Sequence, residues 1–191
     1  MSGNIWDVIR AKGLEDYFIS IWMDHSDEEE VARRLGAEAV SRSDFSAATK
    51  NYPFGSGDGP EETLWVGRHG PRWTHVLQIS GNHAASPALH AGLTRDGGRL
   101  LFMCVTEVEG VEDLVLVENA RRTDDIHAFN HTPARPDGLF ARTMADLSFD
   151  GPPGTQENAC LTVVGRITGT PLTEEWFDGR HLLCRVPLGV W

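Results

Sequence analysis

The sequence predicts one α+β domain spanning residues 1–191, with a mainly antiparallel sheet covered by helices from both ends of the chain. Short segments rich in β-branched and aromatic residues follow one another through the middle of the chain, which is typical of neighbouring antiparallel strands. Segments with helical spacing of apolar residues lie toward the C-terminal end and after the first strand. The 191 residues are 40% hydrophobic and 24% charged, as expected for a single globular domain without repeats or linkers.

The N-terminal part of the chain predicts one strand, two helices and a loop. Residues 16–24 are dense in aromatic and β-branched side chains, which favours a buried strand. A helix over 26–36 begins at Ser26, which has capping-box spacing to a glutamate three residues later. A second, short helix over 43–49 begins at Ser43 as its N-cap. Glycine and proline dominate 52–60, so we expect a loop there.

The strongest hairpin signal in the sequence lies between residues 64 and 79. Strands over 64–66 and 73–79 flank a turn rich in glycine, proline and arginine. Alternation places Trp73 and His75 on one otherwise apolar face, where His75 is either a hydrogen-bonded core residue or a functional base. The hairpin tryptophans Trp65 and Trp73 either present an aromatic, cationic surface with the turn arginines or pack in the core. Core packing is the favoured interpretation for all three residues.

The second half of the chain predicts a meander followed by helices. Ser86 is the expected N-cap of a short helix. The remaining predicted elements are this helix over 87–93, strands over 99–107, 113–118 and 121–129, helices over 139–147 and 156–168, a turn of helix at 173–176 and an edge strand over 181–187.

Two segments, 159–187 and 17–36, resemble a family of small, uncharacterised actinobacterial proteins. In that family a helix ending in Leu-Thr-Gly-Val is followed by Leu-Thr-Pro-Glu and a final strand. The resemblance implies a shared core and a cytoplasmic location, and it supplies no catalytic residue or ligand. This chain departs from the family after residue 80: its turn reads Gly-Asn-His-Ala-Ala-Ser, where members usually carry an acidic residue and a glycine-rich turn.

The charge and cysteine content limit the classes of partner. A net charge of −11 and a pI near 5.1 argue against binding to nucleic acids or to a membrane surface, because both need clustered Lys and Arg. The chain has no signal-peptide pattern and no apolar run of membrane-spanning length, so we expect a soluble, cytoplasmic protein. Cys104, Cys160 and Cys184 lie among apolar residues without metal-ligand spacing, which predicts buried free thiols.

The densest run of chemically active side chains is 120–131. If this run is extended, Asp125 and His127 share a face and could orient a general base. Same-face neighbours on a strand are about 7 Å apart, so a solvated edge strand is the favoured interpretation. Together with His131 the pair could also bind a metal, but His-x-x-x-His is diagnostic only on a helix, and Pro133 argues against a helix. We therefore predict no metal site.

No motif in the sequence indicates covalent catalysis or nucleotide binding. The chain lacks Gly-x-Ser-x-Gly, and it also lacks Gly-x-Gly-x-x-Gly and the phosphate-loop pattern. No cofactor is predicted. Our leading hypothesis is therefore a non-enzymatic cytoplasmic binding or interaction module, whose acidic surface recognises a protein partner. This hypothesis expects an exposed apolar patch rimmed by acidic residues.

The alternative hypothesis is a small enzyme or ligand-binding protein of bacterial specialised metabolism, with a pocket lined by His, Asp and Arg. It expects His75 and His127 to face each other across adjacent strands. A homodimer without a small ligand is the third alternative. The catalytic candidates are His75, Asp125 and His127, and the ligand-binding candidates are Trp73, Arg121, Arg122 and His131.

Overall fold

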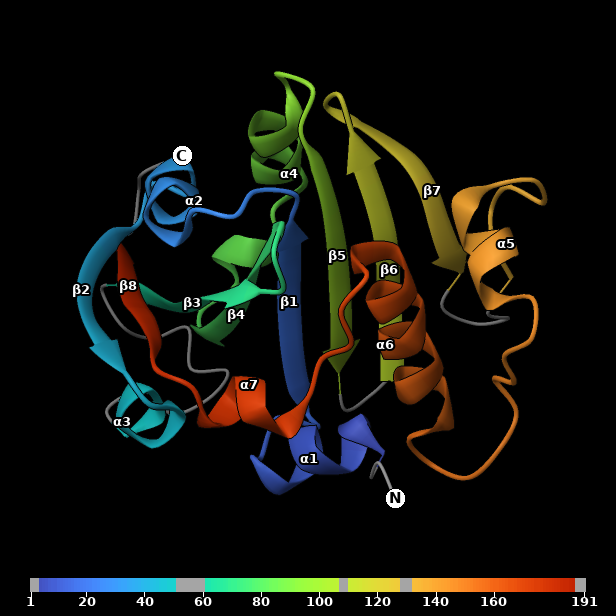
Figure 1. The fold of residues 1–191 in the computed structure, drawn as a ribbon, viewed down its shortest axis with the longest axis horizontal. Helices are drawn as coiled ribbons and strands as arrows, with labels where there is room; N and C mark the ends of the chain where they lie inside the picture. The colour runs from blue at the N-terminus through green and yellow to red at the C-terminus, as the bar shows by residue number, and fades with distance from the viewer. Residues whose placement is uncertain (1–3, 51–60, 107–109, 128–131, 188–191) are drawn as a thin grey trace.

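The computed structural model describes residues 4–50, 61–106, 110–127 and 132–187, with the side chain of residue 127 left out. These residues form one antiparallel eight-stranded sheet with helices on both faces, which confirms the predicted single α+β architecture (Figure 1). The strands are β1 (Tyr17–Met23), β2 (Glu38–Ser43), β3 (Glu61–His69), β4 (Trp73–Ser80), β5 (Arg99–Thr106), β6 (Gly110–Glu118), β7 (Arg121–His127) and β8 (His181–Pro187).

The spatial order of the strands is β2-β8-β3-β4-β1-β5-β6-β7. The order places the β3–β4 hairpin and the β5–β6–β7 meander on opposite sides of β1, which pairs with both β4 and β5. Both sequence-adjacent pairs of the meander, β5–β6 and β6–β7, were predicted, because antiparallel neighbours joined by short turns are the commonest local arrangement. The long-range pairing of β3 with β8, together with that of β8 with β2, makes the C-terminal strand an internal strand of the sheet.

Two groups of helices cover the two faces of the sheet. We call them the α6 face and the α4 face. Figure 1 shows α6 in front of β6, and α7 below β4 between α3 and α1. The α6 face carries α1 (Ile5–Ala11), α3 (Phe45–Thr49), α5 (Leu139–Met144), α6 (Thr155–Thr168) and α7 (Glu174–Asp178). The α4 face carries α2 (Glu28–Arg34), the short 3₁₀ helix η1 (His83–Ala85) and α4 (Pro87–Thr94).

Side-chain alternation divides the strand residues between the two faces. On β1, for example, Trp22 packs into the α6-face core and Ile21 into the α4-face core. Both cores are extensive, and every residue of β4 is buried. The predicted alternation along β4 is confirmed, because Trp73 and Leu77 pack in the α6-face core and Val76 packs in the α4-face core.

Two predicted helix starts are shifted by one residue. The N-cap of α2 is Asp27, whose Oδ1 accepts the backbone N–H groups of residues 29 and 30 at 3.0 and 3.1 Å, and not Ser26. The N-cap of α3 is Asp44, whose Oδ1 accepts the Ala47 N–H at 2.8 Å, and not Ser43. In both cases a carboxylate replaces the hydroxyl, and its charge also favours the positive end of the helix.

The sequence interpretation missed α1 and β2 and placed β8 wrongly. Strand β2 is exposed along almost its whole length and has a bulge between Ala39 and Ser41, so it shows no hydrophobic alternation. Strand β8 was predicted at an edge, but it lies between β2 and β3. The two errors are linked. Because β2 was not predicted, the C-terminal strand had no expected partner on its outer side and was therefore assigned to the edge of the sheet.

The β3–β4 hairpin is longer than predicted, because β3 continues through Gly67 to His69 and the turn contains only residues 70–72. Gly67 lies within strand β3, and the imidazole of His181 packs directly against its backbone. A Cβ atom at this position would overlap that ring, so the glycine permits a close side-chain approach and does not mark a turn. The predicted Ser86 N-cap of α4 is confirmed, with Oγ accepting the Leu89 N–H at 3.3 Å.

Candidate functional site

His75 lies in the core of the α6 face, which confirms the favoured interpretation of this residue as a core histidine. Its ring stacks on Trp22 with centroids 4.4 Å apart and planes at 4°, and it contacts Trp176 of α7 at 4.1 Å. The side chain is completely buried. Trp65 and Trp73 are also buried, so both hairpin tryptophans pack in the core and present no aromatic surface.

A cluster of histidine and tryptophan rings surrounds His75, and we call it the His–Trp cluster. Within it, His181 stacks on Trp176 with centroids 4.5 Å apart. His69 donates its Nε2–H to Thr170 O at 2.8 Å, and His181 donates its Nε2–H to Trp176 O at 2.7 Å. These bonds tie β3 and β8 to the segment around α7. The cluster comprises Trp22, Trp65, His69, His75, Trp176 and His181.

Burial keeps the imidazoles of this cluster uncharged. Desolvation lowers the pKa of His69 to about 4 and lowers the pKa of His181 despite its backbone hydrogen bond. Burial also lowers the pKa of His75 well below its ordinary value, with the neighbouring histidines adding to the effect. His75 Nε2 lies 3.0 Å from Ser20 Oγ, whereas its Nδ1 has no partner among the described residues. Close ring contacts fill the surroundings of His75, so we assign the cluster a structural role.

The predicted pairing of His75 with residues of the 120–131 run is wrong. Strand β7 is separated from β4 by β1, β5 and β6, so His75 and position 127 are not on adjacent strands. Asp125 pairs with Val115, which packs in the α4-face core, whereas His75 belongs to the α6 face. His131 and the side chain of His127 lie outside the described part of the structure.

Strand β7 is an edge strand, as predicted, but its acidic residues are not simply solvated. Asp124 is buried under α5 and accepts the Phe140 N–H at 2.9 Å through Oδ2. Asp125 points to the opposite face, where its Oδ2 accepts from Arg122 Nη2 at 2.5 Å. Residues 124 and 125 therefore lie on opposite faces of the strand, and each carboxylate has a defined partner.

A pocket on the α4 face brings together residues from α4 and the β5–β6–β7 meander. We call it the α4 pocket. It has a volume of about 280 Å³, with Phe102, Val115 and Val117 of the sheet forming an apolar wall. These three side chains are 4 to 5% exposed. The pocket is lined by Ala85, Pro87, His90, Ala91, Phe102, Asp113, Val115, Val117, Ala120 and Arg122.

Charged side chains meet at one side of the α4 pocket. Arg122 Nη2 contacts Asp125 Oδ2 at 2.5 Å and Asp113 Oδ1 at 3.4 Å. Desolvation is the main cause that raises the pKa of Asp113, and Glu112 and Asp125 act in the same direction, whereas Arg122 opposes them. The carboxylate of Asp113 is therefore poorly compensated in the free protein, although it faces a guanidinium.

His90 supplies the second polar group of the pocket. It is 5% exposed, and its ring lies 4.7 Å from that of Phe102. Because a carbonyl oxygen can only accept, the contact of Nε2 with Ala84 O at 2.7 Å places the proton on Nε2. Burial lowers the pKa of His90, so the ring is neutral and its Nδ1 is left with a lone pair.

The turn between β6 and β7 forms another part of the pocket rim. Asn119 and Ala120 have φ values of 51° and 62°, which is unfavourable for a residue with a Cβ atom. The Ala120 N–H donates to Thr94 Oγ1 of α4 at 3.0 Å and holds the turn against the helix. This contact fixes the distance between α4 and the meander, and therefore the width of the pocket.

Of the predicted site residues whose side chains the structure describes, only Arg122 lines the α4 pocket. Asp125 holds Arg122 from outside the pocket lining, Arg121 is exposed at the start of β7, and Trp73 lies in the other core with the Arg99 guanidinium 5.0 Å from its ring. The sequence interpretation missed His90 and Asp113. The sequence does contain a pattern that could have identified Asp113. Positions 113, 115 and 117 lie on one face of a predicted strand, so a carboxylate at position 113 is expected next to the apolar residues at 115 and 117.

In the part of the chain that the structure describes, no group of three or more His, Cys, Asp or Glu side chains is placed to hold a metal ion. No helix within the described ranges is long and apolar enough to cross a membrane.

Comparisons with protein-family models, curated proteins and solved structures give no match to this chain. The α4 pocket therefore has to be interpreted from its own geometry.

Proposed function

We propose that this protein binds a small, mainly apolar molecule in the α4 pocket. The observation that carries the proposal is the combination of a recessed apolar wall of Phe102, Val115 and Val117 with the polar groups of His90, Asp113 and Arg122. Small-molecule sites are typically concave and apolar, with a few polar groups that orient the ligand. The proposal keeps the His/Asp/Arg-lined pocket of the alternative sequence hypothesis but assigns it different His and Asp residues.

The size of the pocket sets the expected affinity. Its volume of about 280 Å³ is near the lower limit for small-molecule sites, so it accommodates a compact ring or a short branched chain. Burial of roughly 150 Å² of apolar ligand surface contributes about 4 kcal/mol, from which the entropic cost of association is subtracted, so we expect weak binding, with a Kd in the millimolar range or above before polar contacts are counted. NMR titration measures binding of this strength.

We propose a cytoplasmic location and membership of the small actinobacterial family for this protein. The three cysteines, Cys104, Cys160 and Cys184, are free and buried, which suits a reducing compartment. Burial raises the pKa of the Cys104 and Cys160 thiols to about 12, so neither is an activated nucleophile. The resemblance of 17–36 and 159–187 supports the family assignment.

An NMR titration with a blocked pocket tests the proposal. Cyclohexyl compounds added to ¹⁵N-labelled protein should shift the amide signals of residues that line the α4 pocket. Ala91 is half-buried on α4 and lines the pocket, so Ala91→Phe should fill the space and abolish these shifts. Ala47→Phe, on the exposed side of α3, is the matched control and should bind as the wild type does.

Two outcomes would contradict the proposal. One is an absence of shifts at saturating concentrations of every compound. The other is an equal response of the wild type and Ala91→Phe, which would place binding elsewhere. Both variants need unfolding curves close to that of the wild type, since a misfolded Ala91→Phe would lose binding for an unrelated reason.

Recognition of a protein partner is the second candidate function, and one groove on the α6 face favours it. Two adjoining hollows of about 420 and 680 Å³ lie between α1, α6 and the segment before α7. Ile5, Pro171 and Leu172 line both hollows, and Glu174 and Glu175 stand at one end. Val40 is the one exposed large hydrophobic side chain of the described residues, so this apolar surface is recessed and does not form a flat patch.

The chemistry of the groove fits an extended peptide that carries an apolar side chain next to a Lys or Arg. Glu174 and Glu175 are exposed, and the net charge of −11 attracts a basic partner. Selection from a displayed peptide library should enrich such sequences. Their binding should be lost in the double variant E174K/E175K and kept in Glu38→Lys, a charge reversal on exposed β2. Enrichment of acidic peptides, or equal binding by both variants, would contradict this second function.

A further inference from the structure

We infer that the ligand of the α4 pocket is an ammonium compound, in which an apolar body occupies the pocket and a protonated amine binds Asp113. This inference rests on the proposed ligand-binding function and adds the chemical class of the ligand. Three features of the described residues carry it: the balance of charges at the pocket, the prior engagement of Arg122, and the tautomer of His90.

The balance of charges at the pocket is negative. Asp113 lines the pocket, Asp125 lies behind Arg122, and Glu112 precedes Asp113 on β6. Arg122 is the single cationic side chain that lines the pocket. The lining itself holds one carboxylate and one guanidinium, and the carboxylates of Glu112 and Asp125, which act on Asp113 from outside the lining, make the surroundings net negative. Such a field favours a cationic ligand over an anionic one.

The carboxylates beside Arg122 disfavour an anionic ligand. Its Nη2 already contacts Asp125 at 2.5 Å and Asp113 at 3.4 Å, so an anion that approached the other N–H groups of this guanidinium would also lie near two carboxylates. The shorter contact belongs to Asp125, whose side chain is only 15% exposed. Asp113 is held at the longer distance through Oδ1 alone, which makes its carboxylate the available acceptor at the pocket.

His90 adds a second acceptor. Its Nε2–H is committed to Ala84 O, so the neutral ring can offer only the lone pair of Nδ1 to a ligand. An amine with two or three N–H groups matches a site in which a carboxylate and an imidazole nitrogen both accept. A carboxylate ligand offers no hydrogen to either of them.

Binding of an ammonium compound should depend on pH through Asp113. Its pKa is raised in the free protein by desolvation and by Glu112 and Asp125, and lowered by Arg122. The ligand binds the ionised form, so its affinity should be constant well above this raised pKa and should fall as the pH is lowered through it. Binding of a neutral analogue lacks this dependence on Asp113.

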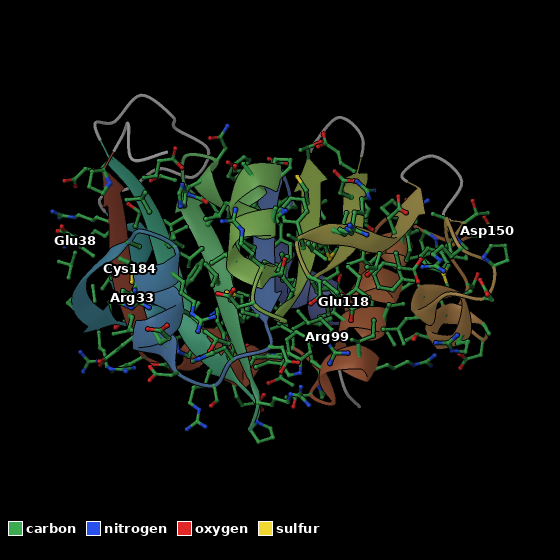
Figure 2. The ribbon with its side chains drawn as sticks, turned by 90° about the horizontal axis from the view of Figure 1, so that it is seen from above. Arg33, Glu38, Arg99, Glu118, Asp150 and Cys184 are labelled. Carbon is green, nitrogen blue, oxygen red and sulfur yellow. The ribbon has the colours of Figure 1, made fainter. Side chains whose placement is uncertain are left out.

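Three ligands of similar size and different charge test the inference: cyclohexylmethylamine, cyclohexylmethanol and cyclohexanecarboxylate. The amine should bind the wild type about tenfold more tightly than the alcohol, since a charge-assisted hydrogen bond replaces a neutral one. Asp113→Asn should remove this advantage and leave alcohol binding within about twofold. The matched control is Asp150→Asn, which Figure 2 shows at the edge of the molecule, away from Glu118 at the end of β6.

The outcomes separate this inference from the proposed function. If none of the three compounds binds, the proposed function fails and the inference fails with it. If the alcohol or the carboxylate binds as tightly as the amine, the pocket binds ligands but the inference is wrong. Asp113→Asn with undiminished preference for the amine would also overturn it. Asp113→Glu, which keeps the charge, should retain part of the preference and distinguishes loss of charge from loss of structure.

Discussion

Arg122 and Asp125 lie on the same face of β7 although they are three residues apart. On a regular strand, residues with odd spacing point to opposite faces. A bulge at Thr123 causes the exception: Arg122 pairs with Val117, Asp124 pairs with Leu116, and Thr123 has no partner in the register. The extra residue reverses the alternation, so Arg122 and Asp125 both face the α4 pocket side and form their ion pair at 2.5 Å.

Arg122→Met should destabilise the protein by about 1 to 2 kcal/mol. The substitution leaves the carboxylates of Asp125 and Asp113 near each other without their shared cation. Urea unfolding at neutral pH measures the change. Arg121→Met, at the exposed start of the same strand, is the control and should change the stability by less than about 0.5 kcal/mol. Equal effects of the two substitutions would show that the ion pair contributes nothing.

The same bulge shows why only part of the site could be predicted. Strict alternation correctly separates residues 124 and 125, because both follow the bulge. It places Arg122 on the wrong face relative to Asp125, because no local pattern marks Thr123 as the extra residue. The pocket also needs α4 to lie against the meander, a contact between elements far apart in the sequence. Residue patterns predict the strands and the helix, but they do not predict that α4 packs against the meander.

Replacement of His75 by Phe should reduce the loss of stability at acid pH. The native pKa of His75 lies well below its ordinary value, so below about pH 6.5 the unfolded chain binds a proton that the native protein does not. Stability is therefore full above pH 6.5 and falls by about 1.4 kcal/mol per pH unit below it. Phe keeps the stacking on Trp22 and removes this titration.

Urea unfolding at pH 7.5 and 5 measures that difference. The wild type should lose more stability between the two pH values than His75→Phe does, and His69, with a pKa near 4, should account for a further part of the wild-type loss. Leu77→Ala, which also removes a buried side chain from β4, should keep the wild-type pH dependence. An unchanged pH dependence in His75→Phe would show that this imidazole titrates normally in the native protein.

Two glycine substitutions should have opposite effects. Gly67→Ala should destabilise the protein by about 2 to 3 kcal/mol, because the new methyl group overlaps the His181 ring, which is packed in the His–Trp cluster. Gly92→Ala, in the middle of α4 with open space around the new methyl group, should stabilise it by about 0.5 to 1 kcal/mol. Thermal unfolding gives both values, and a mild effect at position 67 would mean that His181 can move aside.

Ala120→Gly should stabilise the protein by about 0.5 to 1 kcal/mol. Ala120 adopts a φ of 62°, where a Cβ atom is unfavourable and glycine is not. The Ala120 N–H bond to Thr94 survives the substitution. Ala47→Gly, within α3, should instead lower the stability by about 1 kcal/mol. If Ala120→Gly instead lowers the stability, the gain from relieving the positive φ is smaller than the loss caused by the greater conformational freedom of glycine in the unfolded chain.

The fold was more predictable than the site, for reasons visible in particular elements. Strands β1 and β5 are buried and mainly apolar, the alternation of β4 next to a turn identifies the hairpin, and the Ser86-Pro87 cap marks the start of α4. Strand β2 escaped prediction because it is exposed and bulged. Helix α1 escaped because its buried residues, Trp6 and Ile9, are too few to show a period in seven residues.

Intermolecular NOEs between unlabelled cyclohexylmethylamine and ¹³C-labelled protein test the central claim most directly. Occupation of the α4 pocket predicts NOEs from the cyclohexyl protons to the methyl groups of Val115 and Val117 and to the ring of Phe102. NOEs confined to Ile5, Val8 and Leu172 would place the compound in the groove on the α6 face and contradict the assignment of the α4 pocket as the ligand site.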